Sequence, residues 1–234
     1  MKQPSPVITI ITVVRNAARE IEETFRSVAA LKTDEIEYFV IDGLSDDNTV
    51  EVIKKYASHI DYWLSEADNG IYDAMNKACL LAHGTYVIHV NAGDKLLLIP
   101  PILRSVPENI DIYCGRVATE QGTIIPAWNK SLYTHNTIPH QGCFYRRKVL
   151  LERPYDLQFK IFADYDLNLW LFRNKKTAVM LNDTIAFHSV DGISNQPCHA
   201  AELFRVVRHN CGKCGQFRSW IYFKLQGLQS RWKR

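Results

Sequence analysis

A single acidic residue follows one of the clearest strand patterns in this chain. Residues 85–90, TYVIHV, form a β-branched run that suits an interior strand, and Asp94 comes shortly after it, directly behind Gly93. Open α/β sheets place their ligands just beyond the carboxyl ends of the strands. A carboxylate at that position can meet a hard cation that carries phosphates. The spacing therefore predicts chemistry on a nucleoside diphosphate.

The elements that would position Asp94 alternate regularly along the first part of the chain. Strands are predicted at residues 7–14, 37–42 and 61–65, and helices at residues 17–31 and 50–57. The helix before TYVIHV has apolar residues at helical spacing: Ile71, Ala74, Met75, Ala78, Leu81 and Ala82. Asp68 or Asn69 is placed to cap its start, and Gly84 to end it. This alternation predicts an α/β fold with a doubly wound, mainly parallel sheet.

The pattern changes after Asp94. Six prolines at positions 100 to 154 separate short strands and loops. Within this part, residues 110–115 and 142–146 are the best strand candidates, and residues 163–172 have a helical pattern. We expect one domain over residues 1–200, with a nucleotide half at about 5–94 and a mixed acceptor half at 95–200. Residues 201–234 are expected to form a helical tail.

Composition narrows the class of protein further. No run of about 18 apolar residues occurs, and the chain opens directly into a strand without a leader pattern, so we expect a cytoplasmic protein. Six cysteines are too sparse and irregular for a disulfide framework. Eight of the 28 Lys and Arg residues fall in residues 203–234, which contain no Asp or Glu. This asymmetry favours a local anionic partner and not a nucleic-acid-binding body.

The basic tail also has an apolar sector. Residues 216–234 place six apolar side chains on one side of a helix: Phe217, Trp220, Ile221, Leu225, Leu228 and Trp232. Lys224 and Arg231 flank this sector, where long side chains can reach the surface of a bilayer. One interpretation is docking on the anionic inner face of the plasma membrane as a peripheral protein. The other is a helix packed against the domain.

The residues that follow the first strand exclude two common motifs for binding nucleotide phosphates. Val14, Arg15 and Asn16 follow it without a glycine, so neither a dinucleotide fingerprint nor a P-loop is present. One alternative function is that of a nucleotidyltransferase. Such an enzyme would need a glycine-rich basic loop after the first strand, and this sequence does not supply one. The phosphates must be held in another way, and a metal anchored by a carboxylate is the simplest.

Several motifs in order resemble a known family. ITVVRN, VIDGLSDDNT, SEADNGIYDAMNKA and HVNAGD resemble the family 2 glycosyltransferases with the GT-A fold. HQGCFYRR, YDLQFKIFADYDLNLWL and FHSVDGIS resemble its colanic-acid-type members from bacterial polysaccharide clusters. The resemblance spans about residues 7–195. It implies inverting transfer of a sugar from a nucleotide-diphosphate donor, such as a UDP-sugar, to a glycan acceptor, usually lipid-linked.

The resemblance also assigns donor-binding residues. Asp42 would bind the nucleobase, and Asp68 would face the ribose or diphosphate. Each residue could instead have a purely structural role, Asp42 in capping the GLSDDNT turn and Asp68 in capping a helix. The remaining donor-site predictions are Thr12, Asn76 and Asn91. The segment NAGD stands where the family has its D-x-D motif, and only Asp94 keeps the carboxylate. Asp94 would therefore bind Mg²⁺ or Mn²⁺ mainly together with the donor diphosphate.

Inverting transfer needs a base on the acceptor side. Asp164 and Asp166 both open a predicted helix, and the resemblance favours Asp164 as the base. His140 and Gln141 are predicted to line the acceptor or sugar pocket, again from the resemblance. His188 would either complete the metal shell or be an ordinary core histidine.

Two alternatives remain open. Cys211 and Cys214 have the spacing of half a zinc site, with Cys198, His199 and His209 nearby, but a helix–turn–helix junction with reduced cysteines fits the same residues. Because the metal motif keeps only one carboxylate, the protein could also be a non-catalytic relative that binds a nucleotide-sugar or a glycan.

Overall fold

The computed structural model describes residues 6–105, 109–189 and 199–231, with side chains omitted at 104–105 and 227–231. Its strands are β1 (Ile8–Val14), β2 (Ile36–Asp42), β3 (Tyr62–Ser65), β4 (Tyr86–His89), β5 (Lys95–Leu96), β6 (Ile112–Thr119), β7 (Gly122–Ile124), β8 (Cys143–Arg146) and β9 (Ala178–Phe187). Its α-helices are α1 (Ile21–Ala29), α2 (Thr49–Lys55), α3 (Ile71–Leu81), α4 (Arg147–Glu152), α5 (Ala163–Arg173) and α6 (Ala200–Arg231).

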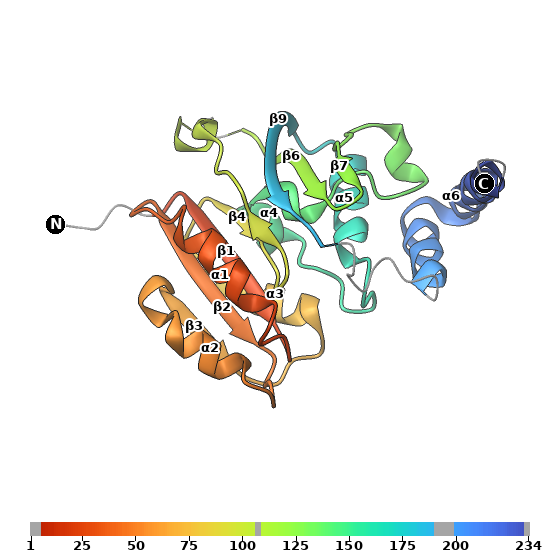
Figure 1. The fold of residues 1–234 in the computed structure, drawn as a ribbon. Coiled ribbons are helices and arrows are strands. Elements are labelled where there is room, and N and C mark those ends of the chain that lie inside the picture. The colour runs from red at the N-terminus through yellow and green to blue at the C-terminus, as the bar shows by residue number, and fades with distance from the viewer. Residues whose placement is uncertain (1–5, 106–108, 190–198, 232–234) are drawn as a thin grey trace.

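One sheet of nine strands runs through the molecule in the order β3-β2-β1-β4-β8-β6-β9-β5, with β7 paired to β6 (Figure 1). The first four strands are parallel, as the strand–helix alternation predicts. β8 then pairs antiparallel to β4, β6 antiparallel to β8, and β9 parallel to β6. The fold is therefore α/β with a mainly parallel first half and a mixed second half.

The sheet has a hydrophobic core on each face. Side chains alternate along β1, so that Ile11 and Val13 join one core while Ile8 and Ile10 join the other. α3, α5 and the start of α6 cover the first face, and α1 and α2 cover the second. Helices on both faces leave the carboxyl ends of the parallel strands open to ligands.

Several predicted boundaries need correction. The first helix begins at Ile21 and not at residue 17, because residues 17–20 form a turn whose Ala17 carbonyl accepts from the amides of Glu20 and Ile21. α3 is capped by neither Asp68 nor Asn69. Gly70 is its N-cap, with φ +114°, a conformation that glycine adopts without strain.

The end of α3 also differs from the prediction. The helix ends at Leu81, with Ala82 as its C-cap, ahead of Gly84. Gly84 instead lets the chain pass close to β1, since a Cβ at this position would lie 2.5 Å from the Thr9 amide nitrogen.

The tail forms α6, which breaks at Gly212 (φ +69°) between Cys211 and Cys214. The predicted helix–turn–helix junction is thus confirmed. The first half packs on the domain through Val206 and Val207, both fully buried. The second half touches residues 134–135 through Ser219 and Tyr222, and its other side is exposed. Figure 1 shows α6 at the opposite end of the molecule from β3 and α2.

Candidate active site

A cavity of about 510 Å³ lies where β4, β9 and the start of α5 meet. It is lined by Glu20, Ile71, Tyr72, Asn91, Ala92, Gly93, Asp94, His140, Gln141, Lys160, Ile161, His188 and Ser189. Four of the predicted site residues are among them: Asn91, Asp94, His140 and Gln141. His188, which the sequence left between two interpretations, lines the same cavity.

The loop that carries Asp94 is held rigidly behind β4. The Asp94 amide donates to the Asn91 carbonyl at 2.9 Å, and the Thr24 hydroxyl of α1 donates to the Asp94 carbonyl at 2.7 Å. Gly93 has φ +93°, which closes the turn without a strained Cβ. The Asp94 side chain is 6% exposed, so its orientation is fixed by the residues packed around it.

His188 meets Asp94 directly. Its Nδ1 lies 2.6 Å from Asp94 Oδ1 and 3.0 Å from Gln141 Nε2. Burial by itself would lower the pKa of His188, but the hydrogen bond and the negative charge of Asp94 outweigh it and raise the pKa above its ordinary value. The two side chains form an oxygen and nitrogen pair that faces the cavity.

Asp164 is the second residue of α5 and lies behind two residues that line the cavity. The Tyr72 hydroxyl lies between two acceptors, the Ile161 carbonyl at 2.8 Å and Asp164 Oδ1 at 3.0 Å. Asn136 Nδ2 donates to Asp164 Oδ2 at 3.2 Å. His140 Nδ1 is 3.3 Å from Oδ2. The carboxylate is thus oriented by three polar groups.

His140 connects the loop of Asp94 with Asp164. Its Nε2 lies 3.3 Å from Asn91 Nδ2, which can only donate, so this nitrogen accepts. The proton of the neutral ring then resides on Nδ1, where it donates to Asp164. This tautomer is inferred from the partners, and it joins the loop of Asp94 to the first turn of α5.

Asp166 has a different environment from Asp164. It is 1% exposed, accepts from Arg153 Nη2 at 2.8 Å and from Asn210 Nδ2 of α6 at 2.6 Å, and does not line the cavity. Burial raises its pKa. Of the two acids that open α5, only Asp164 is linked to cavity-lining groups.

The turn that carries Asp164 is also supported by α6. Phe162, the N-cap of α5, provides no side-chain cap. Instead, Glu202 Oε1 accepts from the amides of Ile161 and Phe162 at 2.7 and 2.9 Å. A carboxylate from a distant helix therefore satisfies two backbone donors next to Asp164.

Two predicted donor residues lie beyond the cavity, at the exit of β2. Asp42 is fully buried and accepts from the hydroxyls of Ser45 and Ser65. Asp68 approaches the same turn, where a Cβ on Gly43 would collide with its carboxylate. Both acids thus gather at the carboxyl end of the parallel strands.

The structure does not bring Thr12 or Asn76 to the cavity. Thr12 is buried, and its hydroxyl donates to the Val90 carbonyl at 2.7 Å, which ties β1 to the segment after β4. Asn76 Nδ2 donates to the Tyr155 carbonyl, and Asn76 Oδ1 accepts from the Tyr155 amide, each at 2.9 Å. Both side chains have internal partners that account for their presence.

Three residues near the site escaped the sequence reasoning. Tyr72 lies inside the motif SEADNGIYDAMNKA, so its position in that motif was the available signal. Lys160 lines the cavity and donates to the Asn69 carbonyl at 2.9 Å. Asn136 comes from a loop with no motif, and nothing in the sequence pointed to it.

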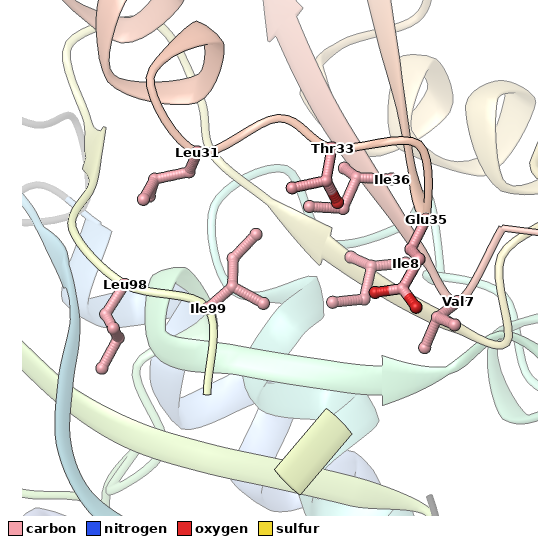
Figure 2. Close-up of a pocket in the computed structure, with 8 residues that line it drawn as sticks. All are labelled: Val7, Ile8, Leu31, Thr33, Glu35, Ile36, Leu98 and Ile99. Atoms are coloured by element: carbon pink, nitrogen blue, oxygen red, sulfur yellow. The ribbon is translucent and has the colours of Figure 1, made fainter. Parts of the chain in front are cut away.

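A second, smaller cavity of about 100 Å³ lies near the start of β1 and β2 (Figure 2). Its lining is mainly apolar: Val7, Ile8, Leu31, Thr33, Glu35, Ile36, Leu98 and Ile99. It contains no cation and one carboxylate, which makes it unsuited to a diphosphate.

In the described part of the chain, no three His, Cys, Asp or Glu side chains are placed so that they could hold a metal ion by themselves. Cys211 and Cys214 are free thiols, and Cys198 of the zinc alternative lies outside the described residues. Asp94 and His188 are therefore a pair and not a complete protein cage.

Comparison with known proteins identifies the family. The sequence model of "Glycosyl transferase family 2" matches residues 9–175. The chain belongs to this family. A PGL/p-HBAD biosynthesis glycosyltransferase from Mycobacterium bovis is 28% identical over 208 residues, which is 82% of this chain and 80% of that protein. A putative teichuronic acid biosynthesis glycosyltransferase, TuaG from Bacillus subtilis, is 32% identical over 95 residues, which is 38% of this chain and 37% of that protein.

Solved structures agree with this fold. S. aureus TarS 1-349 in complex with UDP-GlcNAc has a TM-score of 0.68 at 18% identity, covering 87% of this chain and 66% of that one. Mycobacterium tuberculosis glucosyl-3-phosphoglycerate synthase, in complex with Mn²⁺, UDP and glucosyl-3-phosphoglycerate, has a TM-score of 0.63 at 14% identity, covering 88% and 80%. The family 2 glycosyltransferase described here thus has the GT-A fold. No helix in its described residues is long and apolar enough to cross a bilayer.

Proposed function

We propose that this family 2 glycosyltransferase moves a sugar, with inversion, from a nucleotide-diphosphate donor to a hydroxyl group of a glycan acceptor. The observation that carries the proposal is the arrangement around one cavity. The Asp94–His188 pair lines this cavity, and Asp164 lies directly behind His140 and Tyr72, which line it as well. A leaving diphosphate and an attacking hydroxyl need groups of these two kinds on opposite sides of the anomeric carbon.

The residues fit a divalent cation. A carboxylate oxygen and an imidazole nitrogen suit Mn²⁺, and the carboxylate also suits Mg²⁺. Asn91 Oδ1, in the same loop, is buried and has no hydrogen-bond partner. Asp94 and His188 would hold the ion, and donor phosphates would fill its remaining positions. When bound, the ion would neutralise charge on the departing diphosphate.

The protein's own groups perform the acceptor side of the reaction. Asp164 accepts the proton of the acceptor hydroxyl as that oxygen attacks. Tyr72, Asn136 and His140 hold the carboxylate in place, so little reorganisation is needed during the transfer. Asp42 and Asp68 are proposed to hold the nucleoside at the exit of β2. UDP-GlcNAc in the TarS complex and UDP in the mycobacterial synthase complex support a nucleotide-sugar donor.

Donor turnover tests this proposal. Released nucleoside diphosphate is measured with and without Mn²⁺ for the wild type, Asp94→Ala and Asp164→Asn. Both variants should lose at least a hundredfold in rate, while Asp183→Asn, an exposed acid, should match the wild type. Full activity in Asp164→Asn would remove that residue as the base. If the wild type bound the donor without turning it over, the protein would be a non-catalytic nucleotide-sugar-binding or glycan-binding relative. If it transferred a nucleotidyl group, it would be a nucleotidyltransferase.

The acceptor is proposed to be lipid-linked, with the enzyme held at the inner face of the plasma membrane by the second half of α6. Phe217, Trp220 and Leu225 are 60%, 42% and 55% exposed on that segment. Arg218 and Lys224 lie among them, and apolar and cationic side chains together are typical of helices that lie on anionic bilayers. Deleting residues 216–234 should release the protein from anionic vesicles. Unchanged partitioning would remove the membrane proposal.

A further inference from the structure

The break in α6 forms an elbow with a groove inside it. Gly212 departs from helical geometry, and the ring of Phe204 in the first half lies edge-on to Phe223 in the second, with centroids 5.9 Å apart. A cavity of about 360 Å³ lies in this elbow. We call it the elbow groove, and its lining is Phe204, Arg208, Lys213, Gln216, Phe217 and Trp220.

The elbow groove combines two cations with aromatic walls. Phe217 and Trp220 stack with centroids 6.0 Å apart and an angle of 17° between their planes. Lys224 Nζ lies over the Trp220 ring, 4.0 Å from its centroid. Among the described residues, no carboxylate forms an ion pair with Arg208 or Lys213. Their charge is available to a ligand.

No acid of α6 competes for that charge. Glu202 is the only Asp or Glu in residues 200–231, and its Oε1 accepts from the amides of Ile161 and Phe162. The groove is therefore complementary to an anion. Aromatic side chains beside it that are 42% and 60% exposed suit the boundary between headgroups and acyl chains. One ligand that offers both features is an anionic phospholipid.

We propose that the elbow groove binds the phosphate of one anionic phospholipid headgroup, with Phe217 and Trp220 entering the bilayer beside it. This inference rests on the proposed membrane association and names its contact. Because Val206 and Val207 bury the first half of α6 against the domain, the bound headgroup would lie at a fixed place relative to α5. The bilayer would then set how a membrane-held acceptor approaches Asp164.

The test uses the full chain and vesicles of phosphatidylcholine, alone or with 30% phosphatidylglycerol. Arg208→Gln/Lys213→Gln should weaken binding to the anionic vesicles at least tenfold. The matched control Lys54→Gln/Lys148→Gln removes the same charge at exposed positions outside α6, and should weaken it less than threefold. Equal losses in the two double variants would overturn the groove in favour of diffuse charge attraction.

Further variants separate the remaining explanations. Gln216→Glu adds a carboxylate inside the groove without removing a cation, and should also reduce binding to anionic vesicles. Unchanged binding there would count against the groove even if the double variant proved unstable. Inorganic phosphate at 10 mM should not release the wild type, whereas release would indicate a site for free phosphate. The groove variants should hydrolyse the donor in solution at the wild-type rate. A loss of hydrolysis in these variants would bear on the proposed reaction and not on the groove.

Discussion

Glu202→Ala should weaken the support of the turn that precedes α5, although Glu202 itself does not line the cavity. The carboxylate accepts from two backbone amides, at 2.7 and 2.9 Å, immediately before α5. Loss of a helix cap costs about 0.5–2 kcal/mol, and a hydrogen bond to a charged group contributes about 1.5–3 kcal/mol. We expect a decrease of about 2 kcal/mol in the free energy of unfolding.

The weaker support of this turn should also lower kcat. If about 1.4 kcal/mol of the lost stability appears as poorer placement of Asp164 in the transition state, kcat falls about tenfold. The donor KM should stay within twofold, because the Asp94–His188 side is not contacted by Glu202.

Steady-state kinetics and urea unfolding test this expectation together. Glu202→Gln keeps an acceptor oxygen and should recover most of kcat. Glu152→Ala removes only an exposed ion pair to Lys176, so it should leave kcat unchanged and lower the free energy of unfolding by less than about 1 kcal/mol. A stability loss in Glu202→Ala with kcat unchanged would refute the link between this cap and catalysis.

Other measurements address the cavity and the core behind it. Tyr72→Phe removes the hydroxyl that donates to Asp164 and should lower kcat about tenfold, while Tyr155→Phe, which removes a buried hydroxyl that does not contact Asp164, should stay within twofold. An equal effect on kcat in both variants would argue against a specific contact. Burial lowers the pKa of His89 to about 3. Because the unfolded state takes up this proton below about pH 6.5, stability should fall by about 2 kcal/mol from pH 7.5 to 5, and urea unfolding of His89→Phe should show a shallower pH slope. An unchanged slope would contradict the assignment. Gly142→Ala would place a Cβ 2.6 Å from a carbonyl oxygen of β6 and should cost about 1–3 kcal/mol in thermal unfolding. An unaltered melting temperature would show that the close approach relaxes.

Local pattern was enough to predict the parallel half of the fold. β1 is an apolar run interrupted only by threonines, β2 contains the apolar run 38–41, and α3 has a regular apolar face, so each element is specified by nearby residues. β5 and β7, of two and three residues, were not predicted. Strands that short have no periodicity to detect, and they exist because a partner strand supplies their hydrogen bonds.

The site was only partly accessible to sequence reasoning for a related reason. Asp94 could be placed because its strand precedes it directly. The partners that aim the acids come from far along the chain: His188 is 94 residues from Asp94, and Asn136 is 28 residues from Asp164. Thr12 and Asn76 looked available as polar side chains, but tertiary packing gives them internal hydrogen bonds. Such contacts depend on the topology and not on the local pattern.

The short pairing of β5 with β9 sets how Asp94 and His188 face each other. Lys95 pairs with Phe187, so Asp94 and His188 occupy the next rung of the same antiparallel ladder. A slip by one rung would carry the histidine about 3.3 Å along the strand and reverse the side to which it projects. Although β5 has only two residues, its alignment with β9 thus decides whether the imidazole of His188 meets the Asp94 carboxylate.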